Sequence, residues 1–321
     1  VDKLRGFGVD DHFIRWVYSY LCGRTQQVRL RGVCSDPIVV SSGVPQGSHL
    51  GPILFLVFIN DLVLGLRFVR ALLYADDLKV FAIVRSLTDA SLFQTDLDFL
   101  SHWSFVNGLD FNLGKCKVLS FSRHRSPLCF EYSLCGSLLD RVEPIRDLGV
   151  IFSSDFTFSR HVDSVVSKSF RMLGFIKRAA VKFQVGTILY LFRVLVLPIL
   201  TFSSVVWSPF SKCNIYKLES PQHHLLRFIA FKRGTPMAVY DHNYKEISNS
   251  FLVHSVMSVH RYIDIVVSFK VVNGFLLSPE LSSLFHHREV AYPLREGRWF
   301  QERQSRTNFY FNSAGCRLIR L

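Results

Sequence analysis

Apolar residues follow two spacings along this chain, and together they predict a mixed fold. In some stretches they recur every three or four positions, the spacing of amphipathic helices. In shorter runs bounded by Gly, Asn or Asp they have the length and residue types of strands. Helical spacing dominates beyond about residue 155. We therefore predict an α+β chain with a mixed region over residues 1–155, a helical region over residues 156–285 and an irregular basic tail over residues 286–321.

The predicted elements of the mixed region are three helices and several short strands. The helices cover Asp10–Tyr20, the apolar stretch after Pro52, and Thr88–Val106, and the strands lie at Gln27–Leu30, on both sides of Asp76, near Val118–Phe121 and at Ile145–Phe152. The helices predicted for the second region cover Val162–Phe183, Thr187–Leu197, Tyr216–Phe231 and Leu252–Val272.

One apolar stretch, Ile188–Trp207, is close to the length that spans a bilayer. Arg193 lies within this stretch, and Pro198 interrupts it. Because a charge is costly in a membrane and proline breaks a helix, we predict a helix and turn buried against the core of the second region. No membrane partner is expected.

Composition adds a strongly basic charge. Lys and Arg number 38 against 25 Asp and Glu, which gives a formal net charge of +13 and favours a polynucleotide partner. Five cations recur among the apolar positions of the helix predicted at Val162–Phe183, so one helix face would lie along a duplex; a solvated face is the alternative. These cations are Lys168, Arg171, Lys177, Arg178 and Lys182.

The cysteine pattern indicates reduced thiols and no zinc site. The chain has seven cysteines without paired spacing, which is typical of an intracellular protein. Charged residues in the first eleven positions also break any apolar run, so no signal peptide is expected. Three cysteines lack a close second pair, and Cys213 with His223 and His224 has poor ligand spacing for zinc. The three are Cys116, Cys129 and Cys135.

Two adjacent acids, Asp76 and Asp77, form the first candidate site. They close the apolar run Ala71–Ala75 and precede Leu78–Phe81, which predicts a turn between two strands. Neighbouring carboxylates raise each other's proton affinity unless a cation or hydrogen-bond donors neutralise them, and Mg²⁺ prefers such oxygens. A solvated turn is the alternative, since Asp tolerates turn geometry.

A Gly- and Pro-rich segment, Ser41–Pro52, precedes the apolar stretch Ile53–Ile59. Its glycines and prolines fix the chain path and allow a ligand to approach the backbone. Gln46 adds an amide that both donates and accepts hydrogen bonds. Either Gln46 caps the helix that follows or it contacts a nucleotide near a metal, and the spacing alone does not separate these roles.

These segments, taken together, resemble the reverse transcriptase of non-LTR retrotransposons, particularly the jockey-like branch. The resemblance rests on several blocks in the order that the family uses and extends over essentially the whole chain. They are Ser42–Ser48, Leu50–Phe55, Ile59–Leu62, Tyr74–Asp77, Leu97–Leu100 with Trp103, Asn107–Leu109, Asn112–Lys117, Asp147–Val150, Leu173–Ile176, Val205–Pro209, Val272–Gly274 and Ser278–Leu281.

The resemblance implies a polymerase palm for the first region, then a thumb and a family-specific extension. Because the family primes on chromosomal DNA, it also implies nuclear or cytoplasmic placement. It implies that Asp76 and Asp77 bind Mg²⁺ for nucleotide transfer to a DNA primer on an RNA template, with deoxynucleoside triphosphates as substrates. Lys115 would be a further catalytic residue. The implied nucleotide-binding residues are Gln46, Gly47, Tyr74, Ala75 and Lys117, and the implied primer-support residues are Leu148, Gly149 and Val150. The alternatives are surface lysines and an ordinary turn.

The same resemblance predicts that the palm is incomplete. The family has a further metal-binding Asp on a strand before a segment like Val1–Gly8, and this chain starts within that segment. Asp2 lies on the following helix, where we expect it to cap or face solvent. Because losing a bridging carboxylate costs orders of magnitude in rate, we expect the chain not to polymerise alone. His49 departs from the small or apolar residue expected at its position.

Two alternatives to an active enzyme fragment remain open. The chain would be a non-catalytic nucleic-acid-binding remnant of a transposable element, or part of an intact enzyme taken from a partial gene model. An upstream reading frame that encodes the missing Asp favours the second of these. A group II intron maturase is a more distant possibility, which Leu50–Phe55 disfavours.

Overall fold

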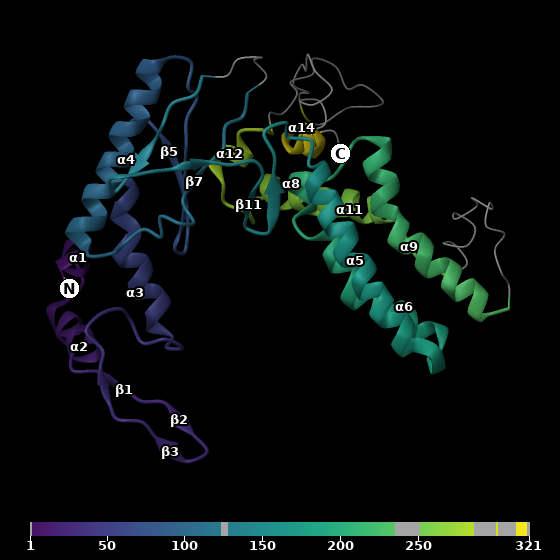
Figure 1. Ribbon diagram of the computed structural model, residues 1–321, viewed down its shortest axis with the longest axis horizontal. Coiled ribbons are helices and arrows are strands. Elements are labelled where there is room, and N and C mark those ends of the chain that lie inside the picture. Colours follow the sequence, from purple (N-terminus) through teal and green to yellow (C-terminus); the bar gives the residue numbers. More distant parts are fainter. Residues whose placement is uncertain (1, 123–127, 235–250, 286–299, 301–312, 320–321) are drawn as a thin grey trace. The chain divides into compact units, whose positions relative to one another are not determined.

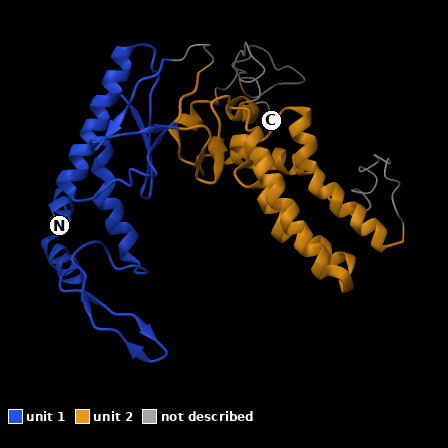
Figure 2. Cartoon of the chain, viewed as in Figure 1, with its two compact units in different colours: residues 1–118, 124–141 blue, residues 119–123, 142–321 orange. Residues whose placement is uncertain are grey.

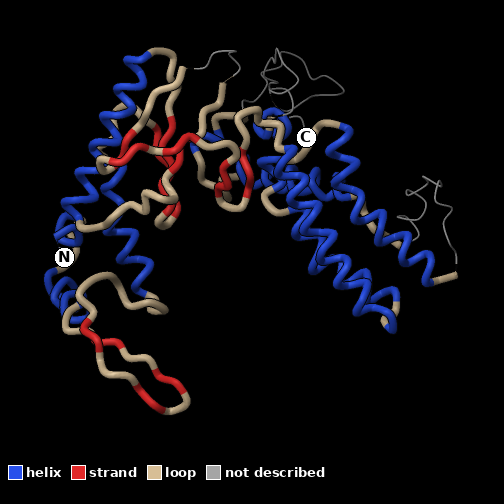
Figure 3. The backbone as a smooth tube through the Cα atoms, in the orientation of Figure 1, coloured by secondary structure: helices blue, strands red, loops and turns tan. Residues whose placement is uncertain are grey.

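The computed structural model describes residues 2–122, 128–234, 251–285, 300 and 313–319, and Figure 1 shows its elements. The chain forms two compact units, one of residues 1–118 and 124–141 and one of residues 119–123 and 142–321 (Figure 2). Helices dominate, and the strands of the described residues form short pairs (Figure 3). The predicted α+β class is therefore confirmed.

The first unit combines helices with short strand pairs. Its helices are α1 (Asp2–Gly6), α2 (Asp11–Leu21), α3 (Leu50–Ile59), the 3₁₀ helix η1 (Asn60–Val63) and α4 (Leu87–Asn107). Its strands are β1 (Thr25–Gln26), β2 (Arg29–Leu30), β3 (Val33–Cys34), β4 (Ile38–Val39), β5 (Arg70–Tyr74), β6 (Asp77–Phe81), β7 (Lys117–Val118), β8 (Ser133–Leu134), β9 (Ser137–Leu138) and β10 (Asp140–Arg141). All of these strands pair antiparallel except β7 and β10, which pair parallel.

Local side-chain chemistry sets the ends of the long helix α4. Ser86 Oγ accepts a hydrogen bond from Asp89 N, and Asp89 Oδ2 accepts one from Ser86 N, which is a capping box. Gly108 ends the helix in the left-handed region, with φ at 62°. The helix predicted at Thr88–Val106 is confirmed, one residue longer at each end.

The core of the first unit forms where α3, η1 and α4 meet. The hairpin of β5 and β6 contributes one face to this core through half-buried Leu73, Leu78 and Val80. The buried members of the cluster are Ile59, Leu62, Ala90, Leu97, Leu100, Trp103, Tyr132 and Leu134. Because the apolar side chains on one face of the hairpin are packed in this core, the other face of the hairpin remains exposed.

The second unit begins with a short hairpin and continues as a helical bundle. The hairpin consists of β11 (Ile145–Asp147) and β12 (Val150–Phe152). Its helices are α5 (Ser159–Ala179), η2 (Ala180–Lys182), α6 (Val185–Leu191), the π-helical turn η3 (Phe192–Val196), α7 (Leu197–Thr201), α8 (Ser204–Trp207), α9 (Lys212–Lys232), α11 (Val256–Val272), α12 (Pro279–Ser282) and α14 (Ala314–Ile319).

The helices α5 and α9 pack along one another, and α6 to α8 close the core beside them (Figure 1). Val162, Ile188, Leu218 and Leu225 are fully buried there. The apolar stretch Ile188–Trp207 thus lies within the helical bundle, as predicted, with a π turn just before Pro198 in the first turn of α7. Among the described helices, none is long and apolar enough to cross a membrane.

Two buried carboxylates of this bundle are paired across helices. Glu219 of α9 accepts hydrogen bonds from Val256 N at 3.1 Å and Met257 N at 2.9 Å, at the start of α11. Burial raises the pKa of this carboxyl group. Arg317 of α14 binds Asp264 of α11 at 3.1 Å and donates to the Val205 carbonyl at 2.7 Å. The run Val205–Pro209 therefore has an internal, structural role.

Most predicted elements are present with shifted ends. The strand predicted at Val118–Phe121 is limited to β7, and that predicted at Gln27–Leu30 to β2. The predicted tail lies mainly outside the described residues, although α14 lies within its range. The palm and thumb boundary at residue 155 is a functional assignment and stays a prediction.

Candidate functional site

The adjacent acids lie at the end of the hairpin of β5 and β6. Tyr74 pairs with Asp77, so Ala75 and Asp76 form a two-residue loop. Ala75 takes φ at 53°, a left-handed conformation that costs an L-residue about 1–2 kcal/mol. The predicted turn is confirmed, and it places the adjacent carboxylates of Asp76 and Asp77 at the tip of the hairpin.

The outer face of this hairpin is open. Tyr74 and Leu72 are 69% and 57% exposed, and both Asp76 and Asp77 are exposed. Within the described residues, neither carboxylate has a hydrogen bond or ion pair. Two adjacent, unpaired carboxylates are hard oxygen ligands and fit part of a divalent-metal site. However, the described part of the chain holds no group of three or more Asp, Glu, His or Cys residues that could bind a metal.

A buried carboxylate that was not predicted from the sequence fixes the start of this hairpin. Asp96 of α4 is only 3% exposed, and it accepts hydrogen bonds from three consecutive backbone N–H groups just before β5. The distances to Oδ2 are 3.2 Å from Arg67, 2.7 Å from Phe68 and 2.8 Å from Val69. A buried carboxylate needs hydrogen-bond partners. Asp96 is three residues after Phe93 and four before Leu100, so the sequence places it on the apolar face of the helix, and this spacing could have indicated its burial.

A second acid, Asp61, connects three elements beside the core against which the hairpin packs. Asp61 Oδ1 accepts from Lys3 Nζ at 2.8 Å and from Trp103 Nε1 at 3.1 Å. The Lys3 ammonium also lies 4.5 Å from the centre of the Phe58 ring. Asp61 and Trp103 therefore connect α1, η1 and α4, which is a structural role for two residues of the recognised blocks.

The Gly-rich turn leads into α3 through a cap supplied by Ser48. Ser48 Oγ donates to the Pro45 carbonyl at 2.8 Å and accepts from Gly51 N at 3.0 Å. A Cβ at residue 51 would lie 3.1 Å from that same carbonyl, so the close approach requires glycine. His49 occupies the cap position without a side-chain bond.

Gln46 is exposed, and Gly47 beside it has φ at 79°. Because Ser48 makes the cap, the alternative in which Gln46 caps the helix is not what the structure shows. No described hydrogen bond joins Gln46 to Asp76 or Asp77. Its contact with a nucleotide stays a prediction.

The two candidate lysines differ in their surroundings. Lys117 of β7 pairs with Asp140 of β10 at 2.7 Å, and this hydrogen bond and charge lower the pKa of Asp140. Lys115 is exposed in the turn before β7, where its N–H donates to the Asn112 carbonyl at 2.9 Å. To contact a phosphate, Lys117 would therefore have to break its ion pair with Asp140, whereas Lys115 has no described ion pair to break.

The predicted primer-support residues form a tight turn in the second unit. Leu148 and Gly149 have φ at 42° and 88°, the pattern of a type I′ hairpin turn between β11 and β12. Val150 is buried in the core, whereas Leu148 is 52% exposed. A Cβ at Gly149 would lie 3.0 Å from the Phe202 ring, a tight contact, and the positive φ favours glycine at this position.

Asp2, which was not expected to bind metal, begins α1. It is exposed, and its Oδ1 lies 3.3 Å from Arg5 Nη1 on the same helix. This contact agrees with a surface role.

The comparisons identify the family. Residues 1–176 match the family described as reverse transcriptase (RNA-dependent DNA polymerase), and the chain belongs to that family. Such enzymes generally use divalent metals, and they act on a nucleic-acid template with nucleotide substrates. The predicted resemblance to jockey-like non-LTR elements is confirmed.

Known relatives come from mobile elements of Drosophila. The RNA-directed DNA polymerase from mobile element jockey of Drosophila funebris is 29% identical over 226 residues, which cover 67% of this chain and 24% of that protein. The probable RNA-directed DNA polymerase from transposon BS of Drosophila melanogaster is 27% identical over 237 residues, 68% of this chain and 26% of the relative. The chain thus spans about a quarter of the length of the curated relatives that it matches. No solved structure matches it significantly.

Proposed function

We propose that this chain contributes to RNA-directed DNA synthesis by a non-LTR retrotransposon, with an RNA template, a DNA primer and deoxynucleoside triphosphates as its partners. Membership of the reverse transcriptase family supports this function. The single observation that carries it is the hairpin tip, where Asp76 and Asp77 are adjacent, exposed and without a described partner. Two adjacent carboxylates that no described residue neutralises are suited to bind a cation.

In this proposal Asp76 and Asp77 would hold Mg²⁺ together with substrate phosphates and a further carboxylate. The bound ion would supply the charge neutralisation and the activation of the primer hydroxyl that nucleotide transfer requires. Asp96 keeps the hairpin in position through the backbone N–H groups before β5. Because two carboxylates alone make an incomplete ligand set, we also propose that the chain does not polymerise by itself.

The remaining roles follow from the family resemblance and the exposure of each residue. Gln46 and Gly47 would contact the incoming nucleotide from their exposed turn, with Tyr74 and Ala75 beside the carboxylates. Lys115 would stabilise the triphosphate charge, and Lys117 would assist after leaving Asp140. The turn of Leu148, Gly149 and Val150 would support the primer end.

Primer extension on an RNA template tests this function directly. We would compare the chain with a chimera in which the upstream part of the Drosophila funebris jockey polymerase precedes it. We expect primer–template binding by both proteins, and Mg²⁺-dependent DNA synthesis by the chimera only. Changing Asp76→Asn and Asp77→Asn in the chimera is expected to lower the rate about 10³-fold or more.

The matched control changes two other exposed acids of the first unit, Asp36→Asn and Asp110→Asn, and is expected to retain the chimera's rate. If the chimera synthesises DNA equally well without the carboxylates at 76 and 77, the proposed site is wrong. If the chain alone extends primers robustly, the proposed dependence on a further carboxylate is wrong. Duplex binding without synthesis by an otherwise folded chimera would favour the non-catalytic alternative.

A further inference from the structure

A cavity of about 380 Å³ lies within the second unit, between the β11–β12 turn, α5 and α7. Sites for small molecules have such volumes, and they are mostly apolar with a few polar groups that orient the ligand. The lining of this cavity has the same composition. Arg146, His161 and Lys168 are its polar members, and the remaining members are apolar residues and one glycine.

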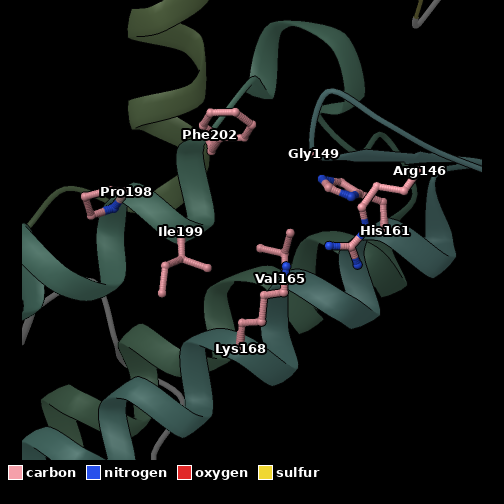
Figure 4. Close-up of a pocket in the computed structure, with 8 residues that line it drawn as sticks. All are labelled: Arg146, Gly149, His161, Val165, Lys168, Pro198, Ile199 and Phe202. Atoms are coloured by element: carbon pink, nitrogen blue, oxygen red, sulfur yellow. The ribbon is translucent and has the colours of Figure 1, made fainter. Parts of the chain in front are cut away.

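Two cations on one side of the cavity have no opposing charge. Figure 4 shows the side chains of Arg146 of β11 and Lys168 of α5 extending toward one another beside the His161 ring. No Asp or Glu is among the described residues that line the cavity, and neither cation has an ion pair within the described part of the chain. An anionic group placed between them would relieve their repulsion and accept charge-assisted hydrogen bonds from both.

His161 adds a hydrogen-bond donor to the wall of the cavity. The residue is 3% exposed, and its Nδ1 accepts a hydrogen bond from Ile151 N at 3.2 Å. Burial is the largest cause that lowers the pKa of His161 to about 4, and the charges of Lys168 and Arg146 add to it, so the ring is neutral near pH 7. The proton of the neutral ring is therefore on Nε2, which has no hydrogen-bond partner among the described residues. A buried donor without an acceptor favours a ligand oxygen at this side of the cavity.

The opposite side of the cavity favours a ligand with an apolar body. Ile199 of α7 and Phe202, just beyond the end of this helix, line that side, and Phe202 is 58% exposed. A small inorganic anion would leave these side chains in contact with water, whereas an aromatic or branched hydrocarbon group would cover them. Because both cations and the His161 ring lie together on the other side, the anionic group is a terminal one, and the hydrocarbon extends from it in a single direction.

We propose that this cavity binds a small amphipathic organic anion, with its terminal carboxylate or phosphate group on Arg146 and Lys168 and its apolar body against Ile199 and Phe202. Such a ligand belongs to a different chemical class from a template, a primer or a nucleotide, so the proposal goes beyond RNA-directed DNA synthesis and does not rest on it. A bound ligand would also connect the β11–β12 turn with α5 and α7, and it would therefore stabilise the folded second unit.

Titration of the full chain with four probes tests the class of ligand. The probes 2-naphthoate and 2-naphthyl phosphate carry the same ring on a carboxylate or a phosphate, 2-naphthamide carries the ring without charge, and acetate has the charge without the ring. In isothermal titration calorimetry, we expect one molecule of at least one naphthyl anion to bind per chain, and the tighter of the two identifies the anionic group. We expect 2-naphthamide and acetate to bind about tenfold more weakly or not at all.

Two variants locate the binding at the cavity. Arg146→Gln with Lys168→Gln should weaken binding of the naphthyl anion about tenfold or more, because both charge-assisted contacts are lost. Phe202→Ala should weaken it about fivefold through the loss of ring contact. The fold should tolerate this second change, because Trp207 Nε1 donates to the backbone carbonyl of residue 202 and not to its side chain.

The matched control, Arg261→Gln with Lys270→Gln, removes the same charge from exposed positions of α11 in the same unit and should leave the affinity within about twofold. Thermal unfolding provides a second measurement and reports whether each variant is folded. A saturating concentration of the naphthyl anion should raise the midpoint of the wild-type chain and of the control by about 3 °C or more, and that of the Arg146→Gln, Lys168→Gln protein by less than about 1 °C.

Three outcomes would overturn the inference. If neither naphthyl anion binds, or if both bind no more tightly than 2-naphthamide, the cavity does not recognise an organic anion. If the cavity and control variants bind the naphthyl anion with equal affinity, the ligand lies elsewhere on the chain. If an RNA–DNA duplex displaces the bound anion in proportion to duplex binding, the cavity is part of a nucleic-acid contact, and the proposed function stands while this inference fails.

Discussion

The acidic hairpin of the first unit is largely exposed, whereas the helical bundle of the second unit is stabilised by a large buried core. Among the described residues, ten of the twelve largest fully buried side chains belong to the second unit, and only Leu62 and Leu100 belong to the first. The hairpin exposes Tyr74, Asp76 and Asp77 and has a strained Ala75 at its tip. Its position depends on one buried face and on the carboxylate of Asp96.

In the first unit, the residues proposed for chemistry are therefore not the residues that stabilise the fold. Exposed carboxylates such as Asp76 and Asp77, which have no partner among the described residues, can be exchanged at little cost to the fold. In the second unit, in contrast, titratable groups such as His161, Glu219 and His260 are buried, so their protonation is coupled to folding. Three variants test this contrast, from the largest expected effect to the smallest.

The largest effect is expected from pH and His161. Its pKa is lowered to about 4 when folded, against 6.5 for the unperturbed group, so the unfolded chain takes up the proton first as pH falls. The stabilisation is fully present above pH 6.5 and is lost as pH falls toward 4, and it amounts to about 3 kcal/mol. His161→Phe should therefore flatten the fall in unfolding free energy over this range, measured by urea titration at several pH values.

The control for this prediction is His254→Phe, which replaces an exposed histidine of the same unit. His161→Phe also leaves Ile151 N without its acceptor, so a loss of about 1 kcal/mol at pH 7 is expected and must be separated from the slope. Equal slopes for the two variants would show that His161 is not the responsible group.

The second prediction concerns the start of the acidic hairpin. Asp96→Asn removes the charge that three backbone N–H groups share, which should lower the unfolding free energy of the first unit by about 2 kcal/mol. Amide hydrogen exchange at Arg67, Phe68 and Val69 should accelerate accordingly. Asp98→Asn is the control, because Asp98 is exposed on the same helix and, among the described residues, accepts a hydrogen bond only from Gln94 Nε2.

If Asp98→Asn destabilises the unit as much as Asp96→Asn, the three N–H groups do not depend on the charge of Asp96. The contrast between the units would then be weaker, since the hairpin would be positioned by its apolar face alone.

The sequence predicted elements better than it predicted partners. Long amphipathic patterns placed α4, α5, α9 and α11 to within a few residues, because side-chain periodicity and caps act locally. The hairpin at Asp76 was equally clear, since an apolar run, two acids and a second run predict a turn between strands, and the structure shows that its loop has two residues. The short strand β7, in contrast, depends on a partner more than twenty residues away, which local pattern does not reveal.

The site was predictable only in part. The resemblance singled out Asp76, Asp77 and Gln46, and the structure shows all three exposed. It gave no indication that Lys117 pairs with Asp140 or that Asp96 fixes the hairpin, because these contacts join segments that lie far apart in the sequence. Likewise, the cationic positions predicted on one helix divide in the structure: Lys168 lines a cavity, while Lys177 lies over the Phe228 ring at 5.4 Å, where burial lowers its pKa.

The smallest effect is expected at the tip of the hairpin, and it tests whether Ala75 is strained. Glycine adopts positive φ without the penalty of a Cβ, so Ala75→Gly relieves strain while adding freedom to the unfolded chain. The two effects nearly cancel, and the net gain in unfolding free energy should be about 0.5 kcal/mol. Ala82→Gly, at an exposed position after β6 without positive φ, should instead lower stability by a similar amount. Opposite signs for these two variants in thermal unfolding would establish that the loop holding Asp76 is under strain, whereas equal losses would show that Ala75 is relaxed and that the hairpin tip stores nothing.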